Sequence, residues 1–368
     1  MDRKTFLKST FLGAAGVGTG ILSCKNSPTE SNVVQQNSKL YKWKMVTTWP
    51  PNFPVLGEAC TLFAQWVKEL SQGQMSITVY GAGELIPAME VFDAVSNGAA
   101  EMGNGASYYW AGRHPSTPYF TSVPFGLNAQ QMNAWLYSGE GMQLWNELYA
   151  KYNLKPFPSG NTGVQMAGWF NRKMNTIADF KGLKMRMPGL GAKVISKIGA
   201  TAVLSSGSEI YTNLERGVID ATEWIGPYHD YIMGFHKIAK YYYAPGWHET
   251  GSTLENIINL REYNALPRFL QEVLETASSR MNVWVLSEFE AKNNLYLKKI
   301  KEESKVELLT FSPEILSSLR DKAREVLNEI SMYDEMAQKI HQSYFRFYKE
   351  MNEWSTFSEK AFYNLPKL

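Results

Sequence analysis

The chain has 368 residues, more than one compact core usually organises, so we expect two domains. Its 44% hydrophobic and 20% charged residues are typical of a globular protein, and 37 basic against 35 acidic residues leave a net charge of +2. No basic stripe stands out along the chain, which argues against nucleic-acid binding. Aromatic residues reach 13%, a level that suits an aromatic-lined cleft for a small ligand.

Residues 1–24 have the composition of an export signal. A basic start is followed by an apolar run from Phe11 to Leu22, which is too short for a permanent membrane helix. The sequence ILSC resembles a lipobox, in which Cys24 becomes the lipidated first residue of the mature protein. The stretch DRKTFLK resembles a twin-arginine export signal, except that Lys4 replaces the second arginine. We therefore predict export to the cell envelope, with a poorly packed N-terminal helix as the alternative.

Residues 25–40 are polar and rich in Ser, Asn and Gln, a composition that predicts a flexible tether between the lipid and the folded domain. Cys60 is the other cysteine of the chain. Because a lipidated Cys24 could not pair with it, we expect Cys60 to be a small buried hydrophobic residue.

Strands and helices alternate after the tether. Residues 42–51 are predicted to form a strand that ends at two prolines, and apolar residues at helical spacing follow from Leu56 to Leu70. The stretch 75–83 returns to a strand, and 88–102 to a helix. This alternation predicts α/β layers around mainly parallel sheets.

The alternation resumes after a helix-rich connector at 129–152. We expect strands at 164–170, 183–189 and 200–206, and helices at 192–198 and 208–217. Ser208 is the expected N-cap of the last helix, and Gly217 lies just past its end.

The C-terminal part of the chain has a different pattern. Residues 314–365 contain neither Gly nor Pro, and apolar residues recur in steps of four and three, which predicts long helices packed along one line. Two arrangements fit this spacing: helices that fold back over the chain's own domains, or helices that contact a second copy in a homodimer. The residues of the predicted seam are Ile315, Leu319, Ala323, Val326, Ile330, Tyr333, Ala337, Ile340, Tyr344, Phe347, Met351 and Trp354.

Three stretches together resemble a known family. They are residues 81–112, which end in GASYYWAG, residues 183–203, which begin with LKMRMPG, and SEIYTNLERGVIDATEWIGP at 208–227. The chain resembles the extracytoplasmic solute-binding proteins of tripartite ATP-independent periplasmic (TRAP) transporters over residues 44–264. The family unit Y-x-x-L-x-x-G-x-I-D-x-x-E is matched by Tyr211, Leu214, Gly217, Ile219, Asp220 and Glu223. TGVQMAGWF, ATEWIGPYHD and YYYAPGWHETG resemble the branch that binds 2-oxo or 2-hydroxy monocarboxylates with a metal ion.

The resemblance implies a two-lobed α/β binding-protein fold with a hinge and an interlobe cleft. The first lobe would comprise residues 41–160 and 253–312, the second residues 161–252, and 313–368 would be a C-terminal helical segment. The protein would be a receptor, not an enzyme. It would bind a small organic acid in the periplasm or cell envelope and deliver it to the TRAP membrane permease.

Arg186 is the candidate carboxylate ligand. It lies at the end of an apolar strand and before a Pro-Gly turn, and a guanidinium offers two parallel donors to the two oxygens of a carboxylate. The family's carboxylate-binding arginine maps to this position. The alternative is a surface arginine that extends from the strand edge into water.

The resemblance also implies a metal shell formed by Gln165, Glu223, Glu249 and the carbonyl of Trp224. These oxygen ligands suit Na⁺ or Ca²⁺ and not zinc or copper. Two glutamates, one arginine and one monocarboxylate sum to −1 −1 +1 −1 = −2, a charge that a closed cleft tolerates only with a cation. The count slightly favours Ca²⁺. The alternative for each glutamate is a salt bridge at a domain edge.

Tyr108 and Tyr109 would come from the other lobe and offer phenols to the ligand, with the aromatic core as the alternative position. Trp224, Trp247 and Phe170 are interpreted as apolar walls. The histidines at 114, 229, 236 and 248 are interpreted as structural, since none forms a ligand pair at helical spacing.

Three other functions remain possible at this level. An exported metal-dependent hydrolase or lyase could use Glu223 or Glu249 as a general base, although neither G-x-S-x-G nor H-E-x-x-H occurs. A structural lipoprotein would bind no small ligand. A receptor of the same family could bind another organic acid, but a dicarboxylate would need a second arginine, for which Arg113 and Arg172 are candidates.

Overall fold

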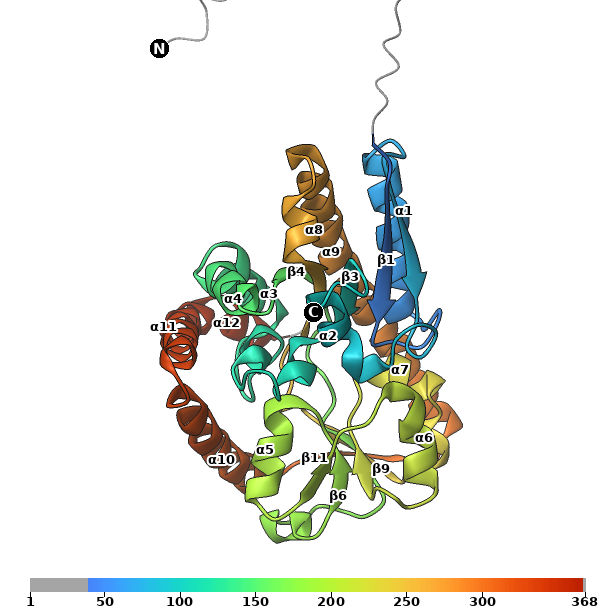
Figure 1. Ribbon diagram of the computed structural model, residues 1–368. Coiled ribbons are helices and arrows are strands. Elements are labelled where there is room, and N and C mark those ends of the chain that lie inside the picture. The colour runs from blue at the N-terminus through green and yellow to red at the C-terminus, as the bar shows by residue number, and fades with distance from the viewer. Residues whose placement is uncertain (1–38, 367–368) are drawn as a thin grey trace, which may run out of the picture. The chain divides into compact units, whose positions relative to one another are not determined.

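The first of two β-sheets has four strands from residues 41–161 and a fifth strand at Thr253–Asn259. The computed structural model describes residues 39–366, so the predicted signal peptide, Cys24 and nearly all of the tether lie outside the described residues. β1 pairs in parallel with β2 and β3, whereas β10 runs antiparallel to β3 and β4 (Figure 1). The strand order is β2 (Met75–Tyr80), β1 (Tyr41–Thr47), β3 (Met102–Gly105), β10 (Thr253–Asn259) and β4 (Leu154–Asn161).

The second sheet has six strands and contains Arg186 at the end of one of them. Its order is β11 (Glu307–Thr310), β9 (Tyr241–Ala244), β5 (Gly168–Phe170), β8 (Ala221–Thr222), β6 (Lys184–Arg186) and β7 (Thr201–Val203). We call the first sheet with its helices the first lobe, and the second sheet with its helices the second lobe.

The prediction of mainly parallel sheets needs a correction, because both sheets are mixed. β5 is antiparallel to its neighbours β8 and β9, and β10 is antiparallel to both of its neighbours. Both strands directly follow a crossing between the lobes, at 162–167 and 245–252. A strand that enters a sheet from the other lobe runs against strands that enter by helical crossovers within the lobe.

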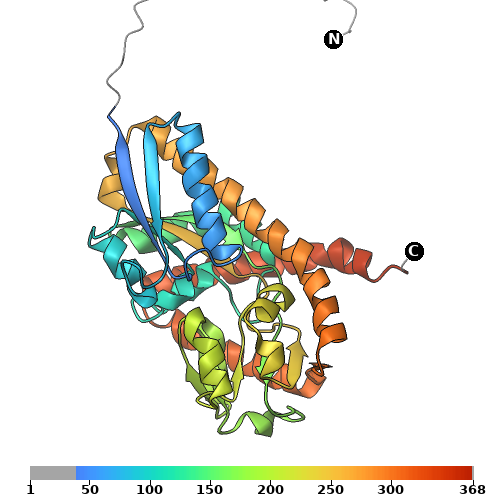
Figure 2. The same ribbon diagram turned by 90° about the vertical axis from the view of Figure 1, so that its right-hand side faces the viewer.

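The placement of Glu307–Thr310 also differs from expectation. The expected boundary at residue 312 assigned this segment to the first lobe, but β11 pairs in parallel with β9 at the edge of the second sheet. The reason is the helix before it. α9 (Arg268–Glu303) is 36 residues long and contacts α1 (Leu56–Leu70) and β4 in the first lobe and α7 (Pro227–Ile232) in the second. Figure 2 shows α9, in orange, as a long helix that runs along both lobes, and the strand that follows it, β11, pairs with β9.

The remaining helices cover the sheets. In the second lobe, the N-cap of α6 (Gly207–Glu215) is Ser206 and not the predicted Ser208, because the Glu209 carboxylate accepts the Ser206 backbone N–H at 3.0 Å and closes a capping box. α6 ends before Gly217, which has φ +70°. The helices between β2 and α9 not yet given are α2 (Val91–Ser96), α3 (Ala129–Tyr137), α4 (Gly141–Ala150), α5 (Gly189–Lys197) and α8 (Leu260–Asn264).

The C-terminal seam divides into a buried part and an exposed part. α10 (Pro313–Ser331) packs on α5, and α11 (Glu335–Phe357) packs on α3 and α4, so the first part of the seam folds back over the chain's own lobes. Further along, Trp354 is 62% exposed. Large apolar residues of α12 (Glu359–Tyr363) are exposed as well. The buried seam residues are Ile315, Leu319, Ala323, Val326, Ile330, Ala337, Ile340 and Tyr344.

The prediction for Cys60 is confirmed. Its side chain is buried under α1, and burial raises the pKa of the thiol far above its ordinary value. Among residues 39–366, none of the helices is both long enough and apolar enough to span a membrane.

Candidate functional site

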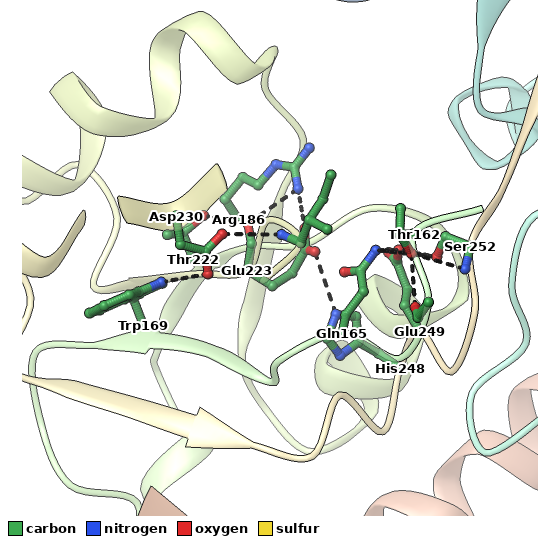
Figure 3. A network of polar contacts seen from close by, with 12 residues as sticks. Thr162, Gln165, Trp169, Arg186, Thr222, Glu223, Asp230, His248, Glu249 and Ser252 are labelled. Atoms are coloured by element: carbon green, nitrogen blue, oxygen red, sulfur yellow. Dashed lines mark hydrogen bonds and ion pairs between the residues drawn. The ribbon is translucent and has the colours of Figure 1, made fainter. Parts of the chain in front are cut away.

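Arg186 and Glu223 lie at the ends of two neighbouring strands of the second sheet. β6 and β8 are parallel with Arg186 opposite Thr222, so the two side chains are one residue apart in register. The Glu223 backbone N–H donates to the Arg186 carbonyl at 3.2 Å, and the Arg186 Nη1 forms an ion pair with the Glu223 Oε1. Both side chains are only 1% exposed (Figure 3). The arginine is therefore buried, not a surface residue.

The rest of the Arg186 guanidinium has no partner among the described residues. Its Nε and Nη2 atoms are buried without a hydrogen bond, and its carbon lies 5.2 Å from the centre of the Trp224 ring. A Cβ at Gly207 would come within 2.6 Å of the Trp224 ring, so this glycine lets α6 begin directly against the indole. The guanidinium thus lies between Glu223 and the Trp224 ring, with two donor atoms free among the described residues.

Gln165 and Glu249 lie on the two segments that connect the lobes, and their side chains contact each other. The Gln165 side-chain Nε2 donates to the Glu249 Oε2 at 2.8 Å and to the Thr162 Oγ1 at 3.1 Å, and the Ser252 hydroxyl donates to the same carboxylate oxygen. The Gly246 N–H donates to the Gln165 carbonyl at 2.8 Å, which ties the segments 162–167 and 245–252 together. Gln165 was expected inside a strand, but the strand begins only at Gly168.

His248 belongs to this group of residues, although the sequence interpretation made it structural. Its Nε2 lies 3.4 Å from the Glu223 Oε2, and neither ring nitrogen has a hydrogen-bond partner in the described part of the chain. Glu223, His248 and Glu249 each offer a ligand atom within 4.8 Å of the others. Burial lowers the pKa of His248 to about 4, so the imidazole is neutral near pH 7. The sequence feature that could have placed His248 in the site is its position directly before Glu249.

Asp230 is a second residue that sequence reasoning missed. It is buried at the start of the second lobe's α7 and accepts hydrogen bonds from the Trp169 Nε1 at 2.9 Å and the Tyr242 hydroxyl at 2.6 Å. It also accepts the Ile225 backbone N–H at 3.3 Å. Asp230 therefore fixes the backbone immediately after Glu223 and Trp224.

Tyr108 and Tyr109 reach this region from the first lobe, on a 3₁₀ turn at Ser107–Trp110. A Cβ at Gly189, the first residue of α5, would meet the Tyr108 Cβ at 3.1 Å, so the two lobes touch here. Burial raises the pKa of both phenols, with the charges of Glu223 and Glu249 acting in the same direction and Arg186 in the opposite one. The phenols thus keep their protons and remain available as donors.

Burial disfavours the charged form of both glutamates in the site. Burial raises the pKa of Glu223 to about 7, although Arg186 lowers it. Burial and the charge of Glu223 raise the pKa of Glu249 to about 7, although His248, Ser252 and Arg186 act in the opposite direction. In each case the loss of water outweighs the favourable contacts.

The acceptors present fit a hard cation. The Gln165 Oε1 and the Glu223 Oε2 are buried and have no hydrogen-bond partner among the described residues. A buried oxygen without a donor is costly, and two of them beside the Glu249 carboxylate form the type of oxygen set that Na⁺ or Ca²⁺ takes.

The other predicted site residues lie elsewhere. Arg113 pairs with Asp93, and Arg172 donates to the Asp179 carbonyl at 2.8 Å, both on the surface. Neither supplies a second arginine to the site. Phe170 is buried in the core with Phe311 and does not line the site.

Comparison with known proteins identifies the family. The sequence profile of DctP, the bacterial extracellular solute-binding protein family 7, matches residues 45–334. The chain belongs to this family. The chain is therefore a solute-binding receptor of a transport system and not an enzyme.

A similar curated protein and two similar structures come from the same group. The monocarboxylate 2-oxoacid-binding periplasmic protein of Nostoc sp. is 38% identical over 364 residues, which cover 99% of this chain and 98% of that protein. A TRAP periplasmic solute-binding protein from Pseudoalteromonas atlantica, solved with sodium and pyruvate, has a TM-score of 0.87 and 40% identity and covers 89% of this chain and 100% of that one.

The second structure is a TRAP transporter solute-binding protein from Bordetella bronchiseptica. Its TM-score is 0.87 at 34% identity, with 89% of this chain and 97% of that chain covered. It is a mixed-occupancy dimer, with copurified calcium and picolinate in one site and the other site apo. These likenesses confirm the two-lobed α/β fold and the assignment to TRAP receptors.

Proposed function

We propose that this TRAP receptor binds a 2-oxo or 2-hydroxy monocarboxylate of the size of pyruvate or lactate together with Na⁺ or Ca²⁺. It then delivers the acid to the membrane permease. The observation that carries the proposal is the set of buried polar atoms without partners. Arg186, with two free donors, pairs with Glu223, and the Glu223 carboxylate lies near Glu249, which is hydrogen-bonded to Gln165. One connected group of residues thus offers both an anion site and a cation site.

Arg186 would hold the carboxylate of the acid. Its Nη1 is already paired with Glu223, and its Nε and Nη2 remain as a fork of two donors that matches two carboxylate oxygens. The ligands of the two similar structures, pyruvate and picolinate, both carry a donor atom next to the carboxylate. An acid of this type can bind the cation and Arg186 at the same time.

Gln165, Glu223, Glu249 and the carbonyl of Trp224 would hold the cation. The cation supplies positive charge that offsets the glutamates and fixes the oxygens of the acid. With the acid bound, the charges sum to −1 −1 +1 −1 = −2, and Ca²⁺ neutralises this sum while Na⁺ leaves −1. His248 lies against the same carboxylates and is a neutral donor for the ligand. Tyr108 and Tyr109 would close over the acid from the first lobe.

Thermal melts test the proposal. The protein lacking signal and tether should gain stability with pyruvate or lactate plus Na⁺ or Ca²⁺, because a ligand that binds only the folded state stabilises it in proportion to the logarithm of its concentration over Kd. Succinate is the control for a dicarboxylate. If no short 2-oxo or 2-hydroxy acid raises Tm with either ion, the assignment to this branch is wrong.

We also propose a homodimer through the C-terminal helices. Trp354 is 62%, Phe357 83% and Phe362 68% exposed, an amount of apolar surface that a second copy would cover. One similar structure is a dimer. Sedimentation should give a dimer for the parent and a monomer for the double variant Trp354→Ser/Phe357→Ser, and a monomeric parent would contradict the proposal.

The lipid anchor on Cys24 and the twin-arginine route are proposals from the sequence. Mass spectrometry of the protein from the cell envelope should find a diacylated N-terminal Cys24. Cell fractionation should find the Cys24→Ser variant in the soluble fraction. Arg3→Lys should block export if the twin-arginine route is used, and export unchanged by this substitution would indicate the general secretory route.

A further inference from the structure

The loop between β1 and α1 contains a strained residue. Val55 has φ 60° and ψ −60°, and the Leu56 N–H donates to the Pro54 carbonyl at 2.7 Å, which is the hydrogen bond of a γ-turn with positive φ. A β-branched residue rarely adopts this conformation. Such strain persists only where the surrounding structure enforces it, and it is concentrated at functional sites.

Contacts with α1 enforce this conformation. The Phe53 carbonyl accepts the N–H groups of Gly57 at 2.9 Å and Glu58 at 3.1 Å, and the Phe53 N–H donates to the Pro50 carbonyl at 3.1 Å. A Cβ at Gly57 would lie 3.1 Å from the Pro50 oxygen, so the loop packs directly on the first turn of the helix. The loop is a rigid support, and the side chain that it presents is Phe53.

Phe53 belongs to the first lobe, but its ring packs on aromatic residues of the second. Its centre lies 6.2 Å from that of Trp224 at 84° and 4.8 Å from that of His229 at 74°. Phe289 of α9 contacts the same His229 ring at 4.8 Å. These are edge-to-face distances, which favour aromatic pairs beyond simple burial.

The rings that Phe53 contacts are uncharged, although one of them is a histidine. Burial lowers the pKa of His229 to about 3, although the Pro54 carbonyl beside the ring acts in the opposite direction. His229 is completely buried, and with this lowered pKa its ring is neutral near pH 7. Phe53, which is itself partly buried, therefore packs against uncharged rings.

Trp224 connects this contact to the binding site. The Arg186 guanidinium lies 5.2 Å from its ring, Gly207 closely approaches the ring, and Phe53 packs edge-on against it. We propose that Phe53 is an interlobe positioning residue, which fixes Trp224 and holds the lobes together while the ion and the acid are bound. The inference rests on the proposed function, in which the Trp224 carbonyl is an ion ligand.

Ligand kinetics provide the first test. In the protein lacking signal and tether, Phe53→Ala should raise the dissociation rate of pyruvate about tenfold at saturating Ca²⁺, with a smaller change in the association rate. Phe53→Leu should restore most of the parental rate, because a leucine keeps an apolar side chain against Trp224 and His229. Phe269→Ala, on an aromatic residue that is 52% exposed on α9, is the matched control and should change neither rate.

A measurement without ligand separates failure of this inference from failure of the proposed function. Spin labels at Lys68 on α1 and Lys193 on α5, both exposed, report the distance between the lobes. Without any ligand, Phe53→Ala should populate longer distances than the parent, and Phe53→Leu should resemble the parent. This outcome does not depend on which acid or ion binds.

Two results would overturn the inference. The first is a distance distribution of Phe53→Ala that equals that of the parent. The second is a fall in the ligand-free Tm with unchanged pyruvate dissociation, which would make Phe53 a purely structural residue. If the parent does not respond to any acid but Phe53→Ala still opens the lobes, the proposed function fails and the interlobe role stands.

Discussion

Arg186 and Glu223 form a buried ion pair across the ends of β6 and β8, and each side chain uses only part of its bonding capacity on the other. The pair is therefore both structural and available for binding. Removing Arg186 outright would leave the Glu223 carboxylate uncompensated, a change that costs about 3–5 kcal/mol in buried pairs. Binding experiments at this position consequently need a variant that keeps the positive charge.

Arg186→Lys should separate binding from stability. A lysine keeps a charge toward Glu223 but loses the two parallel donors, so pyruvate affinity should fall roughly 10- to 100-fold, equivalent to about 1.5–3 kcal/mol for charge-assisted hydrogen bonds. Titration calorimetry measures this loss, and thermal melts should show a much smaller loss of Tm than in Arg186→Ala. Equal pyruvate affinity in the parent and Arg186→Lys would remove Arg186 from the site.

Glu223→Gln should abolish the response to the cation. The amide keeps an oxygen for Arg186 but carries no charge, so stabilisation by Ca²⁺ should disappear. The ligand-free Tm should fall, because the buried Arg186 charge loses the carboxylate that compensates it. Glu215→Gln on the exposed end of α6 is the control. A parental Ca²⁺ shift in Glu223→Gln would place the cation elsewhere.

The pH dependence follows from the raised pKa values of Glu223 and Glu249. Both rise from an ordinary value of 4.5 to about 7, so between these values the folded, ligand-free protein binds more protons than the unfolded chain. The contribution of these groups to stability therefore falls as pH rises through this window.

A cation should reverse that effect. It competes with the protons, so below pH 7 its affinity should increase with pH by about tenfold per unit for each proton displaced. Melts at pH 6, 7 and 8 with Ca²⁺ or chelator should show the largest Ca²⁺ shift at pH 8. A shift that is independent of pH would contradict ligation by these carboxylates.

Gly189→Ala should weaken ligand binding through contact between the lobes. Gly189 has φ +60°, and its new methyl group would meet the Tyr108 side chain at 3.1 Å. Gly182→Ala is a matched control, because Gly182 has φ +73° but no atom within 4 Å. Both variants should lose about 1–2 kcal/mol of stability from backbone strain, but only Gly189→Ala should also lose pyruvate affinity, as measured by calorimetry. Equal affinities would show that closure does not require this contact.

Most helices and strands, and the candidate residues Arg186 and Glu223, could be predicted from the sequence. Which of these residues contact one another could not. Arg186 follows an apolar strand and Glu223 directly follows another, a local pattern that sequence shows. That the two residues form an ion pair depends on the register of β6 and β8, which no local pattern contains. His248 was missed for the same reason, since its contact with Glu223 joins residues from two loops.

Long-range connections account for the other differences. The return of β11 to the second sheet follows from the length of α9, because the helix carries the chain past both lobes before it turns. Most of the seam up to Tyr344 is buried, with Tyr333 exposed at the turn between α10 and α11, whereas Trp354 is exposed further along α11. Spacing alone is the same in both halves of the seam.

The segments 162–167 and 245–252 run between the lobes and are tied to each other by the backbone bonds of Gln165. Gln165 and Glu249 therefore lie on the segments that connect the lobes, whereas Arg186 and Glu223 lie at strand ends of the second lobe. A cation bound by both Glu223 and the pair Gln165 and Glu249 would fix the second lobe relative to the connecting segments before any acid binds. The expected order of loading is then ion first and acid second, so the ion concentration outside the cell would set how many receptors are ready to capture their cargo.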